Sequence, residues 1–140
     1  MSSLKIYIHP NFSPKITTIL YDLHALQKVK KYEIIKWQNL DEEKIDLKTS
    51  IFIMTDNEKK GLSVSTLKHH ESGYRIVACK LPKTKFDFFE LGMTVLRVWP
   101  CIIEKSTDED FLFTFKYGGK RLSGVKIENQ LQNQSAFRAV

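Results

Sequence analysis

Residues 4–14, with the sequence LKIYIHPNFSP, constrain the fold of this chain more than any other stretch. Leu4–Ile8 is a short apolar run that is typical of a buried strand. A polar turn follows it, Ser13 is a favourable N-cap residue, and Pro14 stands at a first helical position, where proline is tolerated. A strand, a tight turn and a helix start together predict the opening of an α/β unit.

The rest of the chain repeats this pattern of short apolar runs and amphipathic stretches. We expect further strands at residues 32–37, 51–54, 75–81 and 111–116. We expect helices at residues 14–28, 40–47, 63–70 and 86–104. This alternation predicts a three-layer, Rossmann-like α/β fold, in which a mostly parallel sheet carries helices on both faces.

The last third of the chain allows more detailed expectations. Residues 86–104 are apolar almost all round, so this helix is expected to be buried on several sides. Pro100 is expected to kink the helix or to end its first half. Residues 111–116 alternate in a way that predicts a strand with one buried face, and Gly118 with Gly119 predicts a hairpin into residues 122–127.

Composition narrows the functional class only a little. The 140 residues predict one domain, residues 1–128, followed by a loose tail rich in Gln and Asn, residues 129–140. The 22 basic and 16 acidic residues give a formal charge of +6, which attracts polyanions but also serves solubility. The chain shows no secretory h-region and no apolar run of membrane length, so we expect a cytoplasmic protein without a membrane partner. Cys79 and Cys101 are expected to be free thiols.

Polar residues stand where the predicted strands end. His9 and Asn11 follow the first strand, and ligands in open α/β sheets bind beyond the carboxyl ends of strands. The acidic residues near the third strand are Asp41, Glu42, Glu43, Asp56 and Glu58. Carboxylates gathered on one rim can hold Mg²⁺ or Mn²⁺, and such an ion activates water against a phosphodiester. The competing interpretation is that these are ordinary turn and cap residues.

Several of these motifs resemble one known family in their order and spacing. Residues 6–14 resemble the opening of PIN-like domains of the VapC toxin type, in which an apolar strand precedes Asp-x-Asn and a Ser-Pro helix start. Residues 41–43 resemble the acidic helix start that follows the second strand of the family. Residues 51–56 resemble the third strand, which ends in Asp. Residues 86–104, with Trp99 and Pro100, resemble the long aromatic helix of these domains.

The resemblance implies a metal-dependent endoribonuclease that acts on RNA as the toxin of a toxin–antitoxin pair and is held by an antitoxin protein. It implies Mg²⁺ or Mn²⁺ as the cofactor and Asp56, Glu42 and Glu58 as metal ligands. The catalytic positions that it implies are His9, Asn11, Glu42, Glu43 and Asp56. Asp56, at the end of an apolar strand, is expected to be an exposed turn residue whose substitution leaves the fold intact.

His9 is the position where this chain departs from the family pattern, which has aspartate. A neutral imidazole is a poor Mg²⁺ ligand and removes one negative charge. Two interpretations follow. Either the remaining donors hold Mn²⁺ or another transition metal, or the domain is a catalytically inactive module that binds RNA or a protein. A receiver-type or flavodoxin-like regulatory domain is a third alternative, but it would need acidic residues at the end of the first strand.

Overall fold

The computed structural model describes residues 4–28, 31–37, 44–57, 61–82, 87–108 and 111–125. The six strands of the described part are β1 (Leu4–Ile8), β2 (Tyr32–Lys36), β3 (Ser50–Asn57), β4 (Ile76–Leu81), β5 (Leu112–Lys116) and β6 (Ser123–Gly124). Its α-helices are α1 (Pro14–Ala25), α2 (Val64–Glu71) and α3 (Phe88–Glu104), and short 3₁₀ turns cover Leu47–Thr49 and Lys105–Thr107. Every predicted strand is therefore present, and so are three of the four predicted helices.

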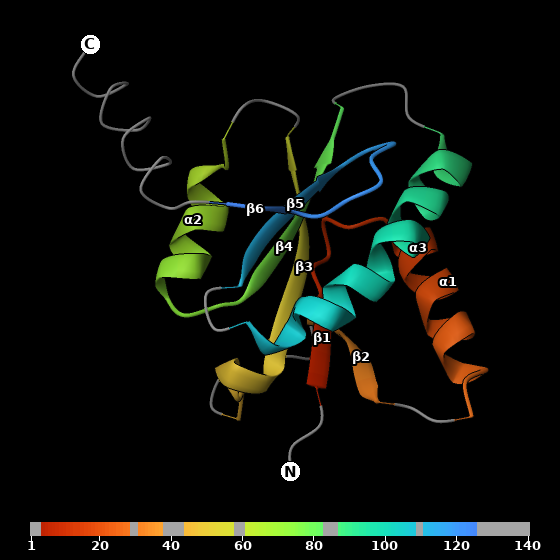
Figure 1. Cartoon of the computed structure of the whole chain (residues 1–140), viewed down its shortest axis with the longest axis horizontal. Coiled ribbons are helices and arrows are strands. Elements are labelled where there is room, and N and C mark those ends of the chain that lie inside the picture. The colour runs from red at the N-terminus through yellow and green to blue at the C-terminus, as the bar shows by residue number, and fades with distance from the viewer. Residues whose placement is uncertain are drawn as a thin grey trace.

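The strands form one sheet in the order β2-β1-β3-β4-β5-β6 (Figure 1). The first five strands are parallel to their neighbours, and β6 is antiparallel to β5. This order confirms the predicted α/β fold with a mostly parallel sheet, and the β5–β6 pairing confirms the predicted hairpin. The chain reverses its direction of travel across the sheet between β1 and β3, the place where open α/β sheets bind ligands.

The helices make three layers with the sheet (Figure 1). On one face, apolar side chains of α1 and α3 share a core with alternate residues of the strands, among them Ile53 and Val77. On the opposite face, Phe52 and Ala78 belong to a second core, which Leu62 and Tyr74 at the two ends of α2 complete. The central strands are thus buried on both faces, which explains why four successive residues of β3, 51–54, are all apolar.

The connection through α3 has an unusual hand. The β3–α2–β4 and β4–α3–β5 connections both advance one strand in the same direction, yet α2 and α3 lie on opposite faces, so their hands must differ. The β1–α1–β2 connection runs the other way on the α3 face and therefore shares the hand of the α2 connection. Because about 98% of such connections are right-handed, β4–α3–β5 is the left-handed one. Its consequence is that α3 packs beside α1.

The helix ends follow from local chemistry. Ser13 Oγ accepts a hydrogen bond from the Ile16 N–H at 3.4 Å, as the N-cap role of Ser13 predicts. Asp87 caps α3 by accepting from the Phe89 N–H at 2.8 Å. Gly73, with φ at +94°, ends the segment after α2 in the left-handed region that favours glycine.

Three local expectations are wrong. The helix α3 is buried on one side only, since Phe89 is 84% exposed. Pro100 does not end the helix, which continues to Glu104, so of the two expectations for Pro100 only a kink stays a prediction. The strand β5 has both faces covered, because Leu112 belongs to one core and Phe115 to the other. The described end of the predicted helix at residues 40–47 is not α-helical. Residues 38–43 and the predicted tail at 129–140 lie outside the described residues.

Two further expectations concern the cysteines and the membrane. Cys79 and Cys101 are both free, as predicted. Cys79 is buried, and burial raises the pKa of its thiol to about 12, so it remains protonated and unreactive.

Within the described ranges, no helix combines the length and the apolar character needed to cross a bilayer.

Candidate functional site at the carboxyl rim of the sheet

The residues that follow β1 join it to the end of β3. The His9 backbone N–H donates to the Ile53 carbonyl at 2.8 Å. Asn11 Oδ1 accepts from the Thr55 N–H at 3.1 Å, while Asn11 Nδ2 donates to the Thr55 carbonyl at 3.4 Å. The Asn11 amide therefore pairs with the backbone of β3 and holds the two strand ends together.

The His9 ring is engaged in a similar way. Its Nδ1 accepts a hydrogen bond from the Asn11 backbone N–H at 3.0 Å, so the proton of the neutral ring is on Nε2. The ring packs edge-on against Trp37, with 4.7 Å between centroids, and Trp37 packs edge-on against His69 of α2 at 5.5 Å. Burial lowers the pKa of His9; the Asn11 side chain opposes this shift, and His69 adds to it. A neutral His9 follows, with its Nδ1 lone pair occupied.

Asp56 is buried, with 9% of its surface exposed, so the expectation of an exposed turn residue is wrong. Its Oδ1 accepts from the Asn57 N–H at 2.7 Å. Its Oδ2 accepts from the Ser63 N–H at 3.0 Å and from the Thr66 hydroxyl at 2.9 Å. The carboxylate therefore holds the first turn of α2 against the end of β3.

Asp56 is also the first residue of a charged row that crosses three strands. In the sheet register Asp56 is paired with Lys80 of β4, and Lys80 is paired with Lys116 of β5. Lys80 Nζ donates to the Gly61 carbonyl at 2.9 Å. Burial lowers the pKa of Lys80; the charge of Asp56 opposes this shift, and the charge of Lys116 adds to it. Two cations and one anion thus give this part of the rim a positive balance.

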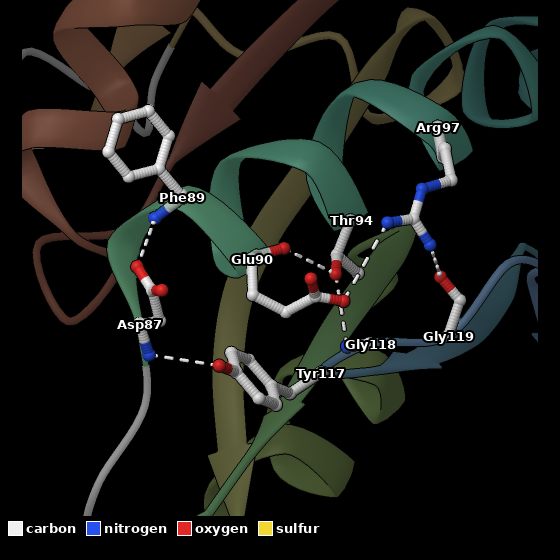
Figure 2. A network of polar contacts seen from close by, with 8 residues as sticks. All are labelled: Asp87, Phe89, Glu90, Thr94, Arg97, Tyr117, Gly118 and Gly119. Carbon is white, nitrogen blue, oxygen red and sulfur yellow. Dashed lines mark hydrogen bonds and ion pairs between the residues drawn. The ribbon is translucent and has the colours of Figure 1, made fainter.

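The turn after β5 is fixed to the first half of α3 (Figure 2). The Asp87 N–H donates to the Tyr117 hydroxyl at 2.9 Å, and the Gly118 N–H donates to Thr94 Oγ1 at 3.0 Å. Gly118 has φ at +78°, which favours glycine at this position of the hairpin. These bonds tie the turn to α3 and its N-cap at two successive residues, through the side chain of Tyr117 and the backbone of Gly118.

A third contact places α3 against the same turn. Arg97 donates to the Gly119 carbonyl at 3.5 Å and lies 3.6 Å from Glu90, with which it forms an ion pair (Figure 2). Lys120 and Arg121, the two residues that follow Gly119 in the chain, are exposed. We call Lys80, Lys116, Lys120 and Arg121 the basic rim. Three of its members, Lys116, Lys120 and Arg121, flank a turn whose position α3 fixes.

The described candidate ligands do not fit a divalent metal. The side-chain oxygen of Asn11 already accepts a hydrogen bond from β3, and the Nδ1 lone pair of neutral His9 accepts one from the Asn11 N–H. Both carboxylate oxygens of Asp56 accept hydrogen bonds, and its neighbour in the register is a lysine, Lys80. In the part of the chain that the structure describes, no three His, Cys, Asp or Glu side chains lie close enough to share one ion.

The other predicted site residues are Glu42, Glu43 and Glu58, and all three lie outside the described residues. Their part in metal binding or catalysis stays a prediction. Comparison with family models, with curated proteins and with solved structures finds no match to this chain.

The residues that complete this site were missed because their partners come from distant segments. Ser63 was expected to start a helix, and its Oγ does accept from the Thr66 N–H at 3.3 Å. The sequence offers one indication of Thr66, which is a hydroxyl residue three positions after the N-cap residue Ser63. The approach of Thr66 to Asp56 depends on the packing of α2 against β3, and neither sequence stretch indicates it by itself.

Proposed function

We propose that this chain is a catalytically inactive, PIN-like module that binds RNA at the basic rim. The row of Asp56, Lys80 and Lys116 carries this proposal. A nuclease site for Mg²⁺ or Mn²⁺ requires several free oxygen donors and a negative field. The row supplies one carboxylate that accepts three hydrogen bonds, together with two ammonium groups, and this arrangement favours an anion over a cation.

Phosphate is the part of RNA that such a surface would contact. Lys116, Lys120 and Arg121 are exposed on or beside a turn that is already fixed. Binding therefore costs little conformational freedom beyond that of these three side chains. Each phosphate contact releases condensed counterions, which makes the affinity fall with salt. Contacts of this kind position the backbone and carry little sequence preference.

Binding of a fluorescently labelled single-stranded RNA, measured by anisotropy over a series of salt concentrations, tests this proposal. We expect the triple variant K116Q/K120Q/R121Q to weaken binding at low salt by roughly tenfold or more. The slope of log affinity against log salt is expected to fall by about 2, because each lost phosphate contact on a single strand contributes about 0.7.

The matched control is the triple variant K31Q/K48Q/K105Q. These lysines are exposed and lie near the amino ends of the strands, and their removal lowers the net charge by the same three units. The control should leave the affinity and the salt slope nearly unchanged. Equal losses in the two triple variants, or binding that is indifferent to salt, would contradict a site at the basic rim.

The metal-dependent ribonuclease that the family resemblance implies is the competing proposal. Its ligands would have to come from Glu42, Glu43 and Glu58, together with a rearranged Asp56. It predicts RNA cleavage that appears with Mn²⁺ or Mg²⁺ and stops with a chelator. The inactive module predicts the same RNA affinity with and without the chelator, once ionic strength is matched.

A further inference from the structure

The exposed apolar side chains of this protein are concentrated on one face. Of the eight large apolar side chains that are exposed in the described ranges, seven belong to α1, its C-cap or α3. They are Ile19, Leu23, Leu26, Phe88, Phe89, Met93 and Leu96. The eighth, Val64, is on α2 across the sheet. Single exposed apolar residues are ordinary, but a group of this size marks an interaction surface.

The two helices bring these residues together. Lys15 Nζ of α1 lies 5.2 Å from the centre of the Phe88 ring of α3, and a Cβ added to Gly92 would lie 3.6 Å from Ile16 Cδ1. The side of α1 that includes Lys15 and Ile16 therefore faces the row of α3 that includes Phe88 and Gly92, and Ile19 lies one turn further along α1. Figure 1 shows the helices side by side on this face of the sheet.

Helical spacing places the other exposed apolar residues in one row along each helix. Ile19, Leu23 and Leu26 follow one another at helical intervals of four and three residues. Phe89, Met93 and Leu96 do the same on α3. We call the seven side chains the α1–α3 patch. A nearby cavity of about 330 Å³ is lined by other residues, so the patch itself presents helix ridges and not a pocket.

We propose that the α1–α3 patch is the contact surface between two copies of this chain. The two most exposed members are Phe89, 84% exposed at the start of α3, and Leu26, 80% exposed at the end of α1. Both helices run antiparallel to the strands, so these residues lie at opposite ends of the patch. A two-fold axis in the plane of the interface, perpendicular to the line from Phe89 to Leu26, places Phe89 of each copy over Leu26 of the other.

The charges beside the patch suit the same arrangement. The two helices carry two cations, Lys15 and Arg97, and three anions, Asp22, Glu90 and Glu104, which is a formal charge of −1, whereas the whole chain carries +6. A highly charged partner would find little complementary charge here, and a second copy meets a nearly neutral border. With helices of 12 and 17 residues, the face measures on the order of 500 Å². Stable pairs bury about 800 Å² on each side, so we expect a reversible dimer.

Light scattering after size exclusion, over a range of protein concentrations, tests this inference. The mass should rise from that of one chain, 16.3 kDa, toward that of two as the concentration increases. The variants M93E and L96E bring like charges together near the axis, so each should raise the dimer dissociation constant at least tenfold. V64E on α2 is the matched control, because Val64 is 58% exposed and lies outside the patch.

A mass of one chain at every concentration would overturn the proposal. Dissociation by V64E as strong as that by L96E would overturn it too. Circular dichroism of each variant shows whether its fold is kept.

Cross-linking tests the two-fold geometry directly, in a background in which Cys101 is replaced by serine. An oxidised mixture of F89C and L26C chains should give the mixed disulfide dimer, and a mixture of V64C and L26C chains should not. Equal cross-linking in the two mixtures would contradict the arrangement.

Discussion

Replacement of Arg75 by methionine is expected to lower the free energy of unfolding by about 3 kcal/mol. Arg75 is 7% exposed, and its guanidinium donates to the Lys48 carbonyl at 2.6 Å, to the Asp108 carbonyl at 3.0 Å and to the Ser106 carbonyl. It also lies over the Phe111 ring at 5.2 Å. One side chain therefore joins the chain segments that precede β3, β4 and β5.

The size of this effect follows from two opposing contributions. Hydrogen bonds from a charged donor contribute roughly 1.5–3 kcal/mol each, and removal of Arg75 leaves three carbonyls without that donor. A cavity of about 530 Å³ beside Arg75 lets water reach some of these carbonyls, which reduces the loss. Denaturant unfolding monitored by circular dichroism measures the result.

Two controls make the Arg75 experiment specific. R75K keeps the positive charge, but one ammonium cannot serve three separated carbonyls, so an intermediate loss is expected. R97M removes a half-exposed arginine whose ion pair with Glu90 is 3.6 Å long, and such pairs contribute less than about 1 kcal/mol. If R97M destabilised the protein as much as R75M, the structural role of Arg75 would be refuted.

The second large effect is expected at Asp56. D56A should lower the free energy of unfolding by about 2–3 kcal/mol, because the Ser63 N–H and the Thr66 hydroxyl lose their buried acceptor. D46A is the control, since Asp46 is exposed and caps a 3₁₀ turn through one hydrogen bond to the Lys48 N–H, so about 1 kcal/mol is expected. Thermal and denaturant unfolding both report these differences.

A double-mutant cycle of D56A with T66V separates the bond from the packing around it. Thr66 is fully buried, and its hydroxyl lies 2.9 Å from Asp56 Oδ2. A structural carboxylate predicts a coupling energy of about 1 kcal/mol between the two sites. Additive effects would show that the Asp56–Thr66 bond does not hold α2 to β3.

The strands and most helices could be predicted because apolar periodicity depends on local sequence. Leu4–Ile8 and the apolar run in β3 are recognisable without their neighbours. The strand order and the left-handed α3 connection depend on which faces are buried together, and no local pattern contains that information. For α3, burial on several sides was predicted wrongly because the exposed apolar residues around Phe89 and Met93 have the same composition as buried ones.

The strand ends that carry the described candidate residues were predicted, whereas the part of these residues in catalysis or metal binding stays a prediction. His9 and Asn11 do follow a central strand, and Asp56 does end the neighbouring one. The expected exposure of Asp56 was wrong because its side chain is engaged by a distant segment, through Thr66 of α2. An acidic residue after a strand has the same appearance in sequence whether it is a metal ligand or an acceptor for the next helix.

Two gels of the same RNA sample show whether the carboxyl rim binds RNA without cutting it. End-labelled single-stranded RNA is incubated at low salt with an excess of protein and with Mg²⁺ or Mn²⁺. It is then run on a native gel and, after the protein is removed, on a denaturing gel. We expect RNA that is retarded on the native gel and full-length on the denaturing gel. Fragments that require the metal, and that vanish with a chelator and in D56N, would contradict it.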